Sequence, residues 1–464
     1  MNYGLEKKKD IYINICENSE KDDQIDTLFR NDKLNRKQII KDLTLVLENT
    51  KDPFTLAINA SWGTGKTTFV KLWSKYLEIN DIKSIYFSAW ENDFSNDPLS
   101  VILAEINIYI KNNESIKKTI KGKFKKIAEI ASKVIVNSTP SIIKILTAGL
   151  IEKEDMKEMI SLLSENTTKL ILDEYEEEKN KILEFKQEFC NFIKEISPNK
   201  PFIIFVDELD RCRPLYAIDL LERIKHIFGI ENVIFVLSID KKELSNSIKS
   251  QYGDIDTNEY LRRFIDLEFK LENKDLEGYC YALRQVFNVD KILTSKSTDN
   301  IYMADYIINV IKCFDLTPRQ IDTFFIKFSI VAKTTSNDYF LVIAFLILLD
   351  IKNHKLYEDF INGKAKEEVK QLVANLDLTG GYYNYIFATI EVIGLSIKQY
   401  EAKIKDFKQY SSPIVQTDKL YKSIYNIIVS IPDGGFPYYM FTHLKEIIEK
   451  INFSNGFYIE TKEV

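Results

Sequence analysis

The strongest constraint on the fold of this chain is a glycine-containing loop that joins a short apolar segment to a helical one. The apolar segment is TLAIN (Thr55–Asn59), the loop is ASWGTGKT (Ala60–Thr67), and helical spacing of apolar residues runs from about Lys66 to Glu78. Glycine permits the tight backbone that turns successive N–H groups toward one phosphate, and a helix start adds partial positive charge. The segment therefore predicts a phosphate-binding loop, in which Ala60 replaces the usual first glycine.

Each residue of this loop has an expected task. Lys66 is expected to reach the β- and γ-phosphates of ATP, and the Thr67 hydroxyl is expected to bind Mg²⁺. The phosphates are expected to be cradled by Trp62, Gly63, Thr64, Gly65, Lys66, Thr67 and Thr68. A glycine turn before an ordinary helix is the alternative, but the strand–loop–helix order favours a nucleotide site.

A second motif supplies two carboxylates. PFIIFVDELDRCRP (Pro201–Pro214) is an apolar run that ends in Asp207 and Glu208. Asp207, at the carboxyl end of a buried strand, is expected to hold Mg²⁺ through its water shell. Glu208 is expected to orient or deprotonate an attacking water, a task worth roughly 10²–10⁴-fold in rate. The pair alone is not diagnostic, but with Lys66 and Thr67 it indicates Mg²⁺-dependent ATP hydrolysis.

The order of apolar segments indicates an α/β domain. Runs that suit strands of a parallel sheet, with helical patterns between them, lie at 55–59, 84–89, 201–206 and 233–239. The stretch of about 111–199 exceeds the roughly 30 residues of a simple crossover and is expected to be a helical insertion. We expect an N-terminal segment over 1–31, the α/β domain over 32–272, a helical lid over 273–350 and a C-terminal helical domain over 351–464.

Composition narrows the class of protein further. The 464 residues are 45% hydrophobic and 28% charged, which excludes disordered, collagen-like and low-complexity chains. With 63 Lys and Arg against 69 Asp and Glu, the formal net charge is −6, so the chain is not coated in positive charge. Five cysteines without a C-x-x-C pair, and no apolar leader segment, indicate reduced thiols in a cytoplasmic protein. Three widely separated histidines disfavour a His-based metal site.

Several further segments, taken in order, resemble the KAP family of P-loop NTPases over much of residues 32–330. They are DKLNR (Asp32–Arg36), Trp62 before GTGKT, FSAWEND (Phe87–Asp93), DELDRC with the later VIFVLSID, YLRRFID (Tyr260–Asp266) and LTPRQID (Leu316–Asp322). The resemblance implies an α/β, ASCE-type P-loop NTPase fold. In this fold a parallel sheet is sandwiched by helices and is joined to a helical insertion, an all-α lid and an all-α C-terminal domain.

The resemblance also implies roles for single residues. Arg36 is expected near the adenine, and Arg319 is expected to be a sensor arginine on the lid. Asp240 takes a sensor-like position near the γ-phosphate, with capping of the next helix as the alternative. Many relatives carry Asp-Asp where this chain carries Asp207-Glu208, and the change keeps a carboxylate that favours hydrolysis.

Arginines and partners follow from the same resemblance. The candidates for a finger that neutralises charge in the transition state are Arg211, Arg262 and Arg263, with ordinary ion pairs as the alternative for each. If Arg262 or Arg263 reaches a neighbouring subunit's site, hydrolysis requires a homo-oligomer. The family resemblance implies bacterial defence against phage or mobile DNA, beside a separate effector protein. We therefore expect an ATPase that acts as a switch or energy source for an assembly.

Three segments bear on whether the chain contacts a membrane or nucleic acid. KAP proteins commonly carry inserted transmembrane helices, but Val134–Ile151 is only about half apolar and contains Pro140 and Lys144, so no span is expected there. Phe340–Leu349 is too short to span and is expected to be a core helix. The basic stretch KKTIKGKFKK (Lys117–Lys126) is expected to be a solvated helix, and contact with an anionic membrane or with nucleic acid stays open.

Three other functions also stay open. One is a scaffold that binds ATP with little turnover. Another is a nucleic-acid-stimulated translocase, against which the net acidity counts. The third is a small-molecule kinase, against which the DELDR strand and the lid arginine count, because they favour water as the acceptor.

Overall fold

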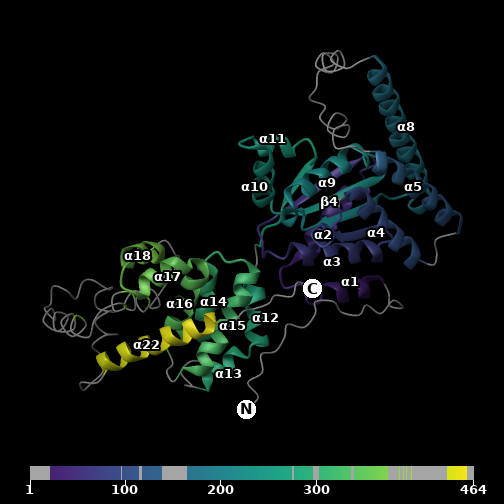
Figure 1. Ribbon diagram of the computed structural model, residues 1–464. Helices are drawn as coiled ribbons and strands as arrows, with labels where there is room; N and C mark the ends of the chain where they lie inside the picture. Colours follow the sequence, from purple (N-terminus) through teal and green to yellow (C-terminus); the bar gives the residue numbers. More distant parts are fainter. Residues whose placement is uncertain are drawn as a thin grey trace. The chain divides into compact units, whose positions relative to one another are not determined.

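The computed structural model describes most of the chain, in several stretches. These are 21–95, 97–113, 118–137, 165–273, 276–295, 303–335, 339–374 and 436–456, with four single residues between 386 and 399. The chain divides into two compact units (Figure 1). We call the described residues up to Glu272 the sheet unit, and those from Asn273 onward the helical unit.

The sheet unit is built on a five-stranded sheet in the order β2-β3-β4-β1-β5, in which every pair of neighbours is parallel. The strands are β1 (Phe54–Asn59), β2 (Ser84–Ser88), β3 (Phe202–Asp207), β4 (Val233–Ile239) and β5 (Leu267–Lys270). The four apolar runs are confirmed as strands. Both β3 and β4 are buried along their whole length, as continuous apolar sequence predicts for strands covered on two faces.

Helices cover both faces of this sheet. Neighbouring residues of a strand point to opposite faces. On one face the Phe205 ring lies 5.4 Å from that of Trp73 in α3, and on the other the Phe202 ring lies 5.8 Å from that of Tyr109 in α4. Figure 1 shows the strands enclosed by helices. The helices of this unit are α1 (Lys21–Phe29), α2 (Arg36–Glu48), α3 (Lys66–Ile79), α4 (Pro98–Asn112), α5 (Lys118–Asn137), α8 (Glu165–Ile196), α9 (Pro214–His226), α10 (Lys241–Tyr252) and α11 (Thr257–Leu261), with a 3₁₀ turn η1 (Leu209–Arg211).

The insertion between β2 and β3 is helical in its described part. The long helix α8 buries an aromatic stripe of Phe185, Phe189 and Phe192 against the sheet unit's core. Its outer face pairs with the basic stretch of α5, where Lys126 lies 2.9 Å from Glu188 and Lys123 bonds Glu195. Both lysines are exposed, in keeping with the expected solvated helix, and the structure adds that they are ion-paired.

The helical unit has its own core. Its helices are α12 (Glu277–Val286), α13 (Val289–Thr294), α14 (Met303–Cys313), α15 (Pro318–Thr334), α16 (Phe340–Lys352), α17 (His354–Ile361), α18 (Lys366–Ala374) and α22 (Phe436–Asn455). Every residue from Phe340 to Leu349 is buried, which confirms a core helix. Helix α16 runs through residue 350, where a domain boundary was expected. Among the described residues, none of the helices combines the length and apolarity needed to cross a bilayer, and most of Val134–Ile151 lies outside those residues.

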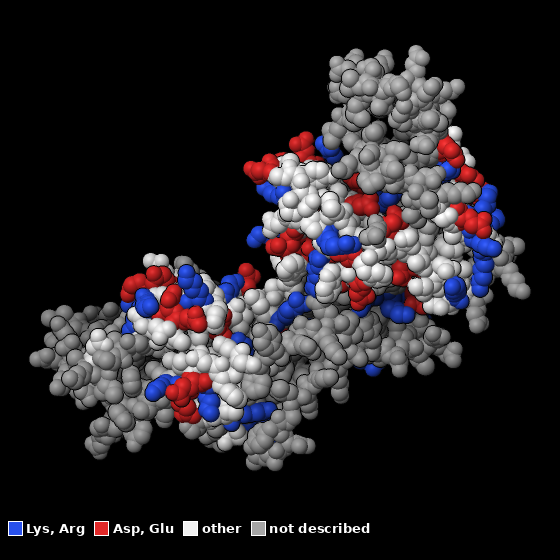
Figure 2. Space-filling view, in the orientation of Figure 1, with Lys and Arg blue, Asp and Glu red and all other residues white. Residues whose placement is uncertain are grey.

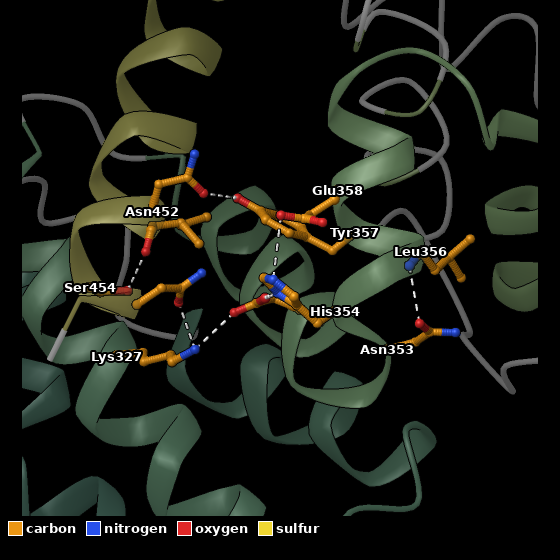
Figure 3. A network of polar contacts seen from close by, with 11 residues as sticks. Lys327, Asn353, His354, Leu356, Tyr357, Glu358, Asn452 and Ser454 are labelled. Carbon is orange, nitrogen blue, oxygen red and sulfur yellow. Dashed lines mark hydrogen bonds and ion pairs between the residues drawn. The ribbon is translucent and has the colours of Figure 1, made fainter. Parts of the chain in front are cut away.

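A polar network links four helices of this unit (Figure 3). The buried Asp350 carboxylate on α16 lies 2.8 Å from Lys327 Nζ of α15 and 2.6 Å from His354 Nδ1 of α17. Lys327 also donates to Asn455 of α22 at 2.7 Å. Because one buried carboxylate holds two bases from different helices, the network fixes how these helices pack.

Candidate nucleotide-binding site

The two sequence motifs meet at one edge of the sheet. The strand register pairs Ser88 with Asp207, Asp207 with Ser238, and Ser238 with Ile58. Because all these strands are parallel, their carboxyl ends lie at the same edge, where ligands of open α/β sheets bind. The loop that starts at Ala60 and the carboxylate of Glu208 therefore share that edge, although they are far apart in sequence.

The loop has the backbone that phosphate binding requires. Gly63 and Gly65 have φ of 79° and 89°, values that favour glycine, and Gly65 immediately precedes α3. The Thr64 hydroxyl donates to Ser61 O at 2.7 Å and closes the turn. Ala60 N donates to Ile239 O at 3.1 Å and so continues the β1–β4 pairing, which explains why a non-glycine residue is accommodated there.

Lys66 is a buried cation surrounded by acids. Its Nζ donates to Ala60 O at 2.7 Å. Burial lowers the pKa of this ammonium, and the carboxylates of Asp210, Asp240 and Asp207 oppose that shift. The side chain is only 9% exposed, so its charge acts in a medium where water screens it poorly.

The Asp207 carboxylate is fixed by two hydrogen bonds and has the chemistry of a magnesium ligand. It is 1% exposed, and its Oδ1 accepts from Glu208 N at 2.9 Å. Its Oδ2 accepts from the Tyr86 hydroxyl at 3.2 Å, and burial followed by the Asp207 charge raises the pKa of that phenol, which therefore keeps its proton. Among the described residues no cluster of three His, Cys, Asp or Glu marks a metal cage. Asp207 and the half-buried Thr67 fit Mg²⁺, which needs few protein ligands beside phosphate and water.

Glu208 sits in a backbone conformation that is uncommon for its type. It has φ 62° and ψ 25°, the left-handed region, and it begins the turn η1. Its Oε2 accepts from the Ser88 hydroxyl at 2.6 Å, and its Oε1 lies 2.9 Å from Arg211 Nη1. Non-glycine residues held in this region cluster at functional sites.

Asp210 and Asp240 tie the loop to the segments that follow β3 and β4. Asp210 accepts from the Trp62 indole N–H, and burial raises the pKa of this carboxyl while Lys66 and Trp62 oppose the shift. Asp240 Oδ2 accepts from Trp62 N at 3.2 Å. Its other oxygen caps α10 by accepting from Lys242 N at 3.2 Å, so the capping alternative is confirmed. A role for Asp240 near the γ-phosphate stays a prediction.

Arg36 contacts the loop backbone. Its Nη2 donates to Thr64 O at 3.1 Å, and its guanidinium carbon lies 5.8 Å from the centroid of the Phe69 ring. The residue begins α2, whose first turn is held by Asp32, which accepts from Arg36 N at 2.5 Å. Burial lowers the pKa of this guanidinium to about 10. Arg36 thus braces the outer side of the loop with a desolvated charge.

The other arginines are distributed differently. Arg262 and Arg263 follow α11 and are exposed. Arg319 lies in the first turn of α15, in the helical unit. Of the finger and sensor candidates, Arg211 contacts the site carboxylate Glu208. Finger and lid roles for Arg263 and Arg319 stay predictions.

Four residues at this edge had no role assigned from the sequence: Tyr86, Ser88, Trp90 and Asp210. The sequence signals were present, since Ser88 and Trp90 lie in FSAWEND and Asp210 lies in DELDRC. Their partners lie in segments far away in the sequence, however, and no local pattern specifies such a partner.

A parallel sheet with a phosphate-binding loop after β1 and acids at the carboxyl end of β3 defines the chain as a P-loop NTPase. The model of the KAP family P-loop domain matches residues 36–335, and the chain belongs to this family. The fold class and the family expected from the sequence are both confirmed.

Known proteins are similar to parts of this chain. An uncharacterized protein of Methanocaldococcus jannaschii is 27% identical over 173 residues, which cover 33% of this chain and 88% of that protein. The Phage T7 exclusion protein of Escherichia coli is 22% identical over 254 residues, which cover 49% of this chain and 31% of that protein. The solved ORC2 protein of Aeropyrum pernix, in ADPNP–ADP complexes, aligns at 13% identity over 89% of this chain and 86% of that one, with a TM-score of 0.27.

Proposed function

We propose that this chain hydrolyses ATP with Mg²⁺ and serves as a switch or energy source in a protein assembly. The observation that carries the proposal is the meeting of Lys66, Asp207 and Glu208 at one sheet edge, with the Asp207 charge acting on the buried Lys66 ammonium. A cation for phosphate, a ligand for metal and a base for water are the parts that phosphoryl transfer to water requires.

Each residue has a task in this mechanism. The backbone N–H groups of the loop from Trp62 to Thr68 bind the β- and γ-phosphates, and Lys66 exchanges its carbonyl partner for phosphate oxygens. Glu208 orients the attacking water and accepts its proton. Asp207 and Thr67 would hold Mg²⁺, which neutralises charge on the phosphates when bound.

Phosphate release by the full chain tests this activity. We expect Glu208→Gln to lower kcat by about 10²-fold or more while ATP binding stays within a few-fold, because the amide still accepts the Ser88 hydroxyl but cannot take a proton. Lys66→Ala is expected to weaken ATP binding itself. If wild type and Glu208→Gln release phosphate equally slowly, the ATPase proposal fails.

A scaffold that binds ATP with little turnover is the second candidate. The observation in its favour is that both oxygens of Glu208 are engaged, one by Ser88 and one by Arg211. The Glu208→Gln comparison separates this candidate from the ATPase.

We further propose a cytoplasmic role in defence against phage, with a separate effector protein. The family and the similarity to a protein named for phage exclusion support the defence role. In the part of the chain that the structure describes, Cys190, Cys212 and Cys280 form no disulfide, which supports a reducing compartment. Co-purification from the native host with nucleotide present tests for the effector.

Oligomerisation is part of the same proposal, through Arg263 acting on a neighbouring subunit. Mixing Lys66→Ala subunits with Arg263→Ala subunits is expected to restore some activity, and no restoration counts against it. Nucleic acid and membrane surfaces have less support, because Lys123 and Lys126 of the basic stretch are ion-paired with α8. On the face shown in Figure 2, the Lys and Arg side chains (blue) are interspersed with Asp and Glu side chains (red).

A further inference from the structure

The side chain of Arg211 is bound to the residue proposed as the catalytic base. Arg211 Nη1 lies 2.9 Å from Glu208 Oε1, and the two side chains are 23% and 11% exposed. The contact is built locally, since Arg211 N donates to Glu208 O at 3.1 Å in a turn that begins with the positive φ of Glu208. The other carboxylate oxygen accepts from Ser88 Oγ at 2.6 Å. A carboxylate that carries a charged hydrogen bond on one oxygen and a hydroxyl on the other is poorly placed to take a proton from water.

The same guanidinium also lies against two tryptophans. Its central carbon is 6.0 Å from the centroid of the Trp62 ring and 5.6 Å from that of the Trp90 ring, both within cation–π distance. Trp62 belongs to the phosphate-binding loop itself, and Trp90 follows Ser88 by two residues. Both tryptophan residues are about half exposed, at 46% and 52%. Arg211 is therefore connected to the loop on one side and to Glu208 on the other.

We propose that Arg211 is a positioning residue that restrains Glu208, so that hydrolysis requires this arginine to leave the carboxylate. This inference rests on the proposed ATPase function and adds its regulation. Trp62 belongs to the loop and is held by Asp240 through its backbone and by Asp210 through its indole. In this proposal a phosphate bound in the loop displaces Trp62 from these contacts and so shifts the ring on which Arg211 rests. Loss of the Arg211 contact frees Glu208 Oε1 to accept a hydrogen bond from water. The tryptophan pair thus couples occupation of the loop to release of the base.

Steady-state phosphate release by the full chain tests the restraint. Arg211→Met removes the charge and keeps an aliphatic stem, and we expect kcat to rise about five- to tenfold with KM for ATP within about twofold, as loss of one charge-assisted bond allows. Arg211→Lys keeps a cation and is expected to retain part of the restraint. The matched control is Lys249→Met, because the Lys249 ammonium makes an exposed ion pair with Asp254 at 3.1 Å and its removal is expected to leave kcat unchanged.

The double variant Arg211→Met with Glu208→Gln is expected to be as inactive as Glu208→Gln alone, because the gain acts through the carboxylate. If Arg211→Met lowers kcat, Arg211 acts on the phosphates and the restraint is overturned. If kcat does not change, it is overturned as well. The proposed function fails by a different result, namely equal phosphate release by wild type and Glu208→Gln.

Tryptophan fluorescence reports on the restraint without turnover. The chain has three tryptophans, and Trp73 is fully buried. A change in the emission of solvent-exposed tryptophan therefore comes from Trp62 and Trp90. We expect Mg·ATP to change the emission of wild type as Arg211 leaves the two rings, and we expect a smaller change in Arg211→Met, which lacks the cation. The double variant Trp62→Phe with Trp90→Phe is expected to lack the change. Calorimetry on the same samples establishes that ATP is bound. ATP binding without any emission change in wild type, or an unaltered change in Arg211→Met, overturns the proposal.

Discussion

Replacement of Arg36 by methionine separates the stability of the fold from the organisation of the phosphate-binding loop. Arg36 is 3% exposed, and its charge is desolvated enough to lower its pKa to about 10. One pKa unit corresponds to about 1.4 kcal/mol, so burial of this charge costs about 3 kcal/mol. Its hydrogen bond to Thr64 O, with a charged donor, returns about 1.5–3 kcal/mol. Because these two contributions nearly cancel, Arg36→Met is expected to change the free energy of unfolding by less than about 1.5 kcal/mol.

Nucleotide affinity is expected to respond more strongly than stability. Without the bond to Thr64 O, the loop must be ordered when the phosphates bind, which weakens binding by about the value of that bond. A loss of about 1.4–2.8 kcal/mol raises the Kd for ATP about 10–100-fold. Calorimetric titration with a slowly hydrolysed ATP analogue and Mg²⁺ measures the Kd, and urea unfolding measures stability.

Lys37→Met is the matched control for Arg36→Met. Lys37 is the next residue of α2, and its ammonium makes an exposed ion pair with Asp26 at 2.6 Å. Exposed pairs contribute about 0–1 kcal/mol, so this variant is expected to keep both its Kd and its stability. An unchanged Kd in Arg36→Met, whatever happens to its stability, would refute the bracing role.

Two other predictions concern the helical unit. Asp350→Ala removes the buried carboxylate that holds Lys327 and His354, and it is expected to cost about 3 kcal/mol of unfolding free energy, whereas Glu358→Ala, at an exposed carboxylate 3.5 Å from His354 Nε2, is expected to cost less than about 1 kcal/mol. Equal losses in urea unfolding would contradict this. Burial raises the pKa of Cys280 to about 12, so at pH 8 only about one thiol in 10⁴ is ionised, and alkylation by iodoacetamide is expected to be slow until urea unfolds the unit. Rapid modification in the native state, detected by mass spectrometry, would show that the thiol is accessible.

Sequence predicts the central sheet well because its physical signal is local. Val233–Ile239 is a continuous apolar run, and a strand covered on two faces needs no information beyond that run. β5 escapes prediction for the converse reason. It is four residues long and mostly exposed, and the apolar–polar alternation of LEFK is too short to distinguish a strand from a loop. Its existence depends on pairing with β1, which is a tertiary event.

In the candidate site too, residues with a local sequence signal can be predicted, whereas contacts that depend on the tertiary structure cannot. Lys66, Thr67 and Asp207 are identified from motifs, since their chemistry is carried by residue types at fixed spacing. The positive φ of Glu208 has no such signal, because glutamate rarely adopts it and only the surrounding contacts hold it there. The contact of Arg36 with Thr64 O likewise needs α2 to lie beside the loop, which no local pattern specifies.

The helical insertion lies between the neighbouring strands β2 and β3, and this position explains why its length does not disturb the candidate site. The chain leaves the sheet after Ser88 and returns at Phe202, the start of the neighbouring strand β3. Once β2 and β3 are paired, their register fixes Asp207 against Ser88, and added length between them costs only about 0.6 kcal/mol for each doubling. The segment directly after β2 is different, because Ala89 N donates to Asp207 O at 2.8 Å and Asp93 pairs with Arg213. The length of the insertion can therefore vary beyond this segment without moving Trp90 away from Arg211.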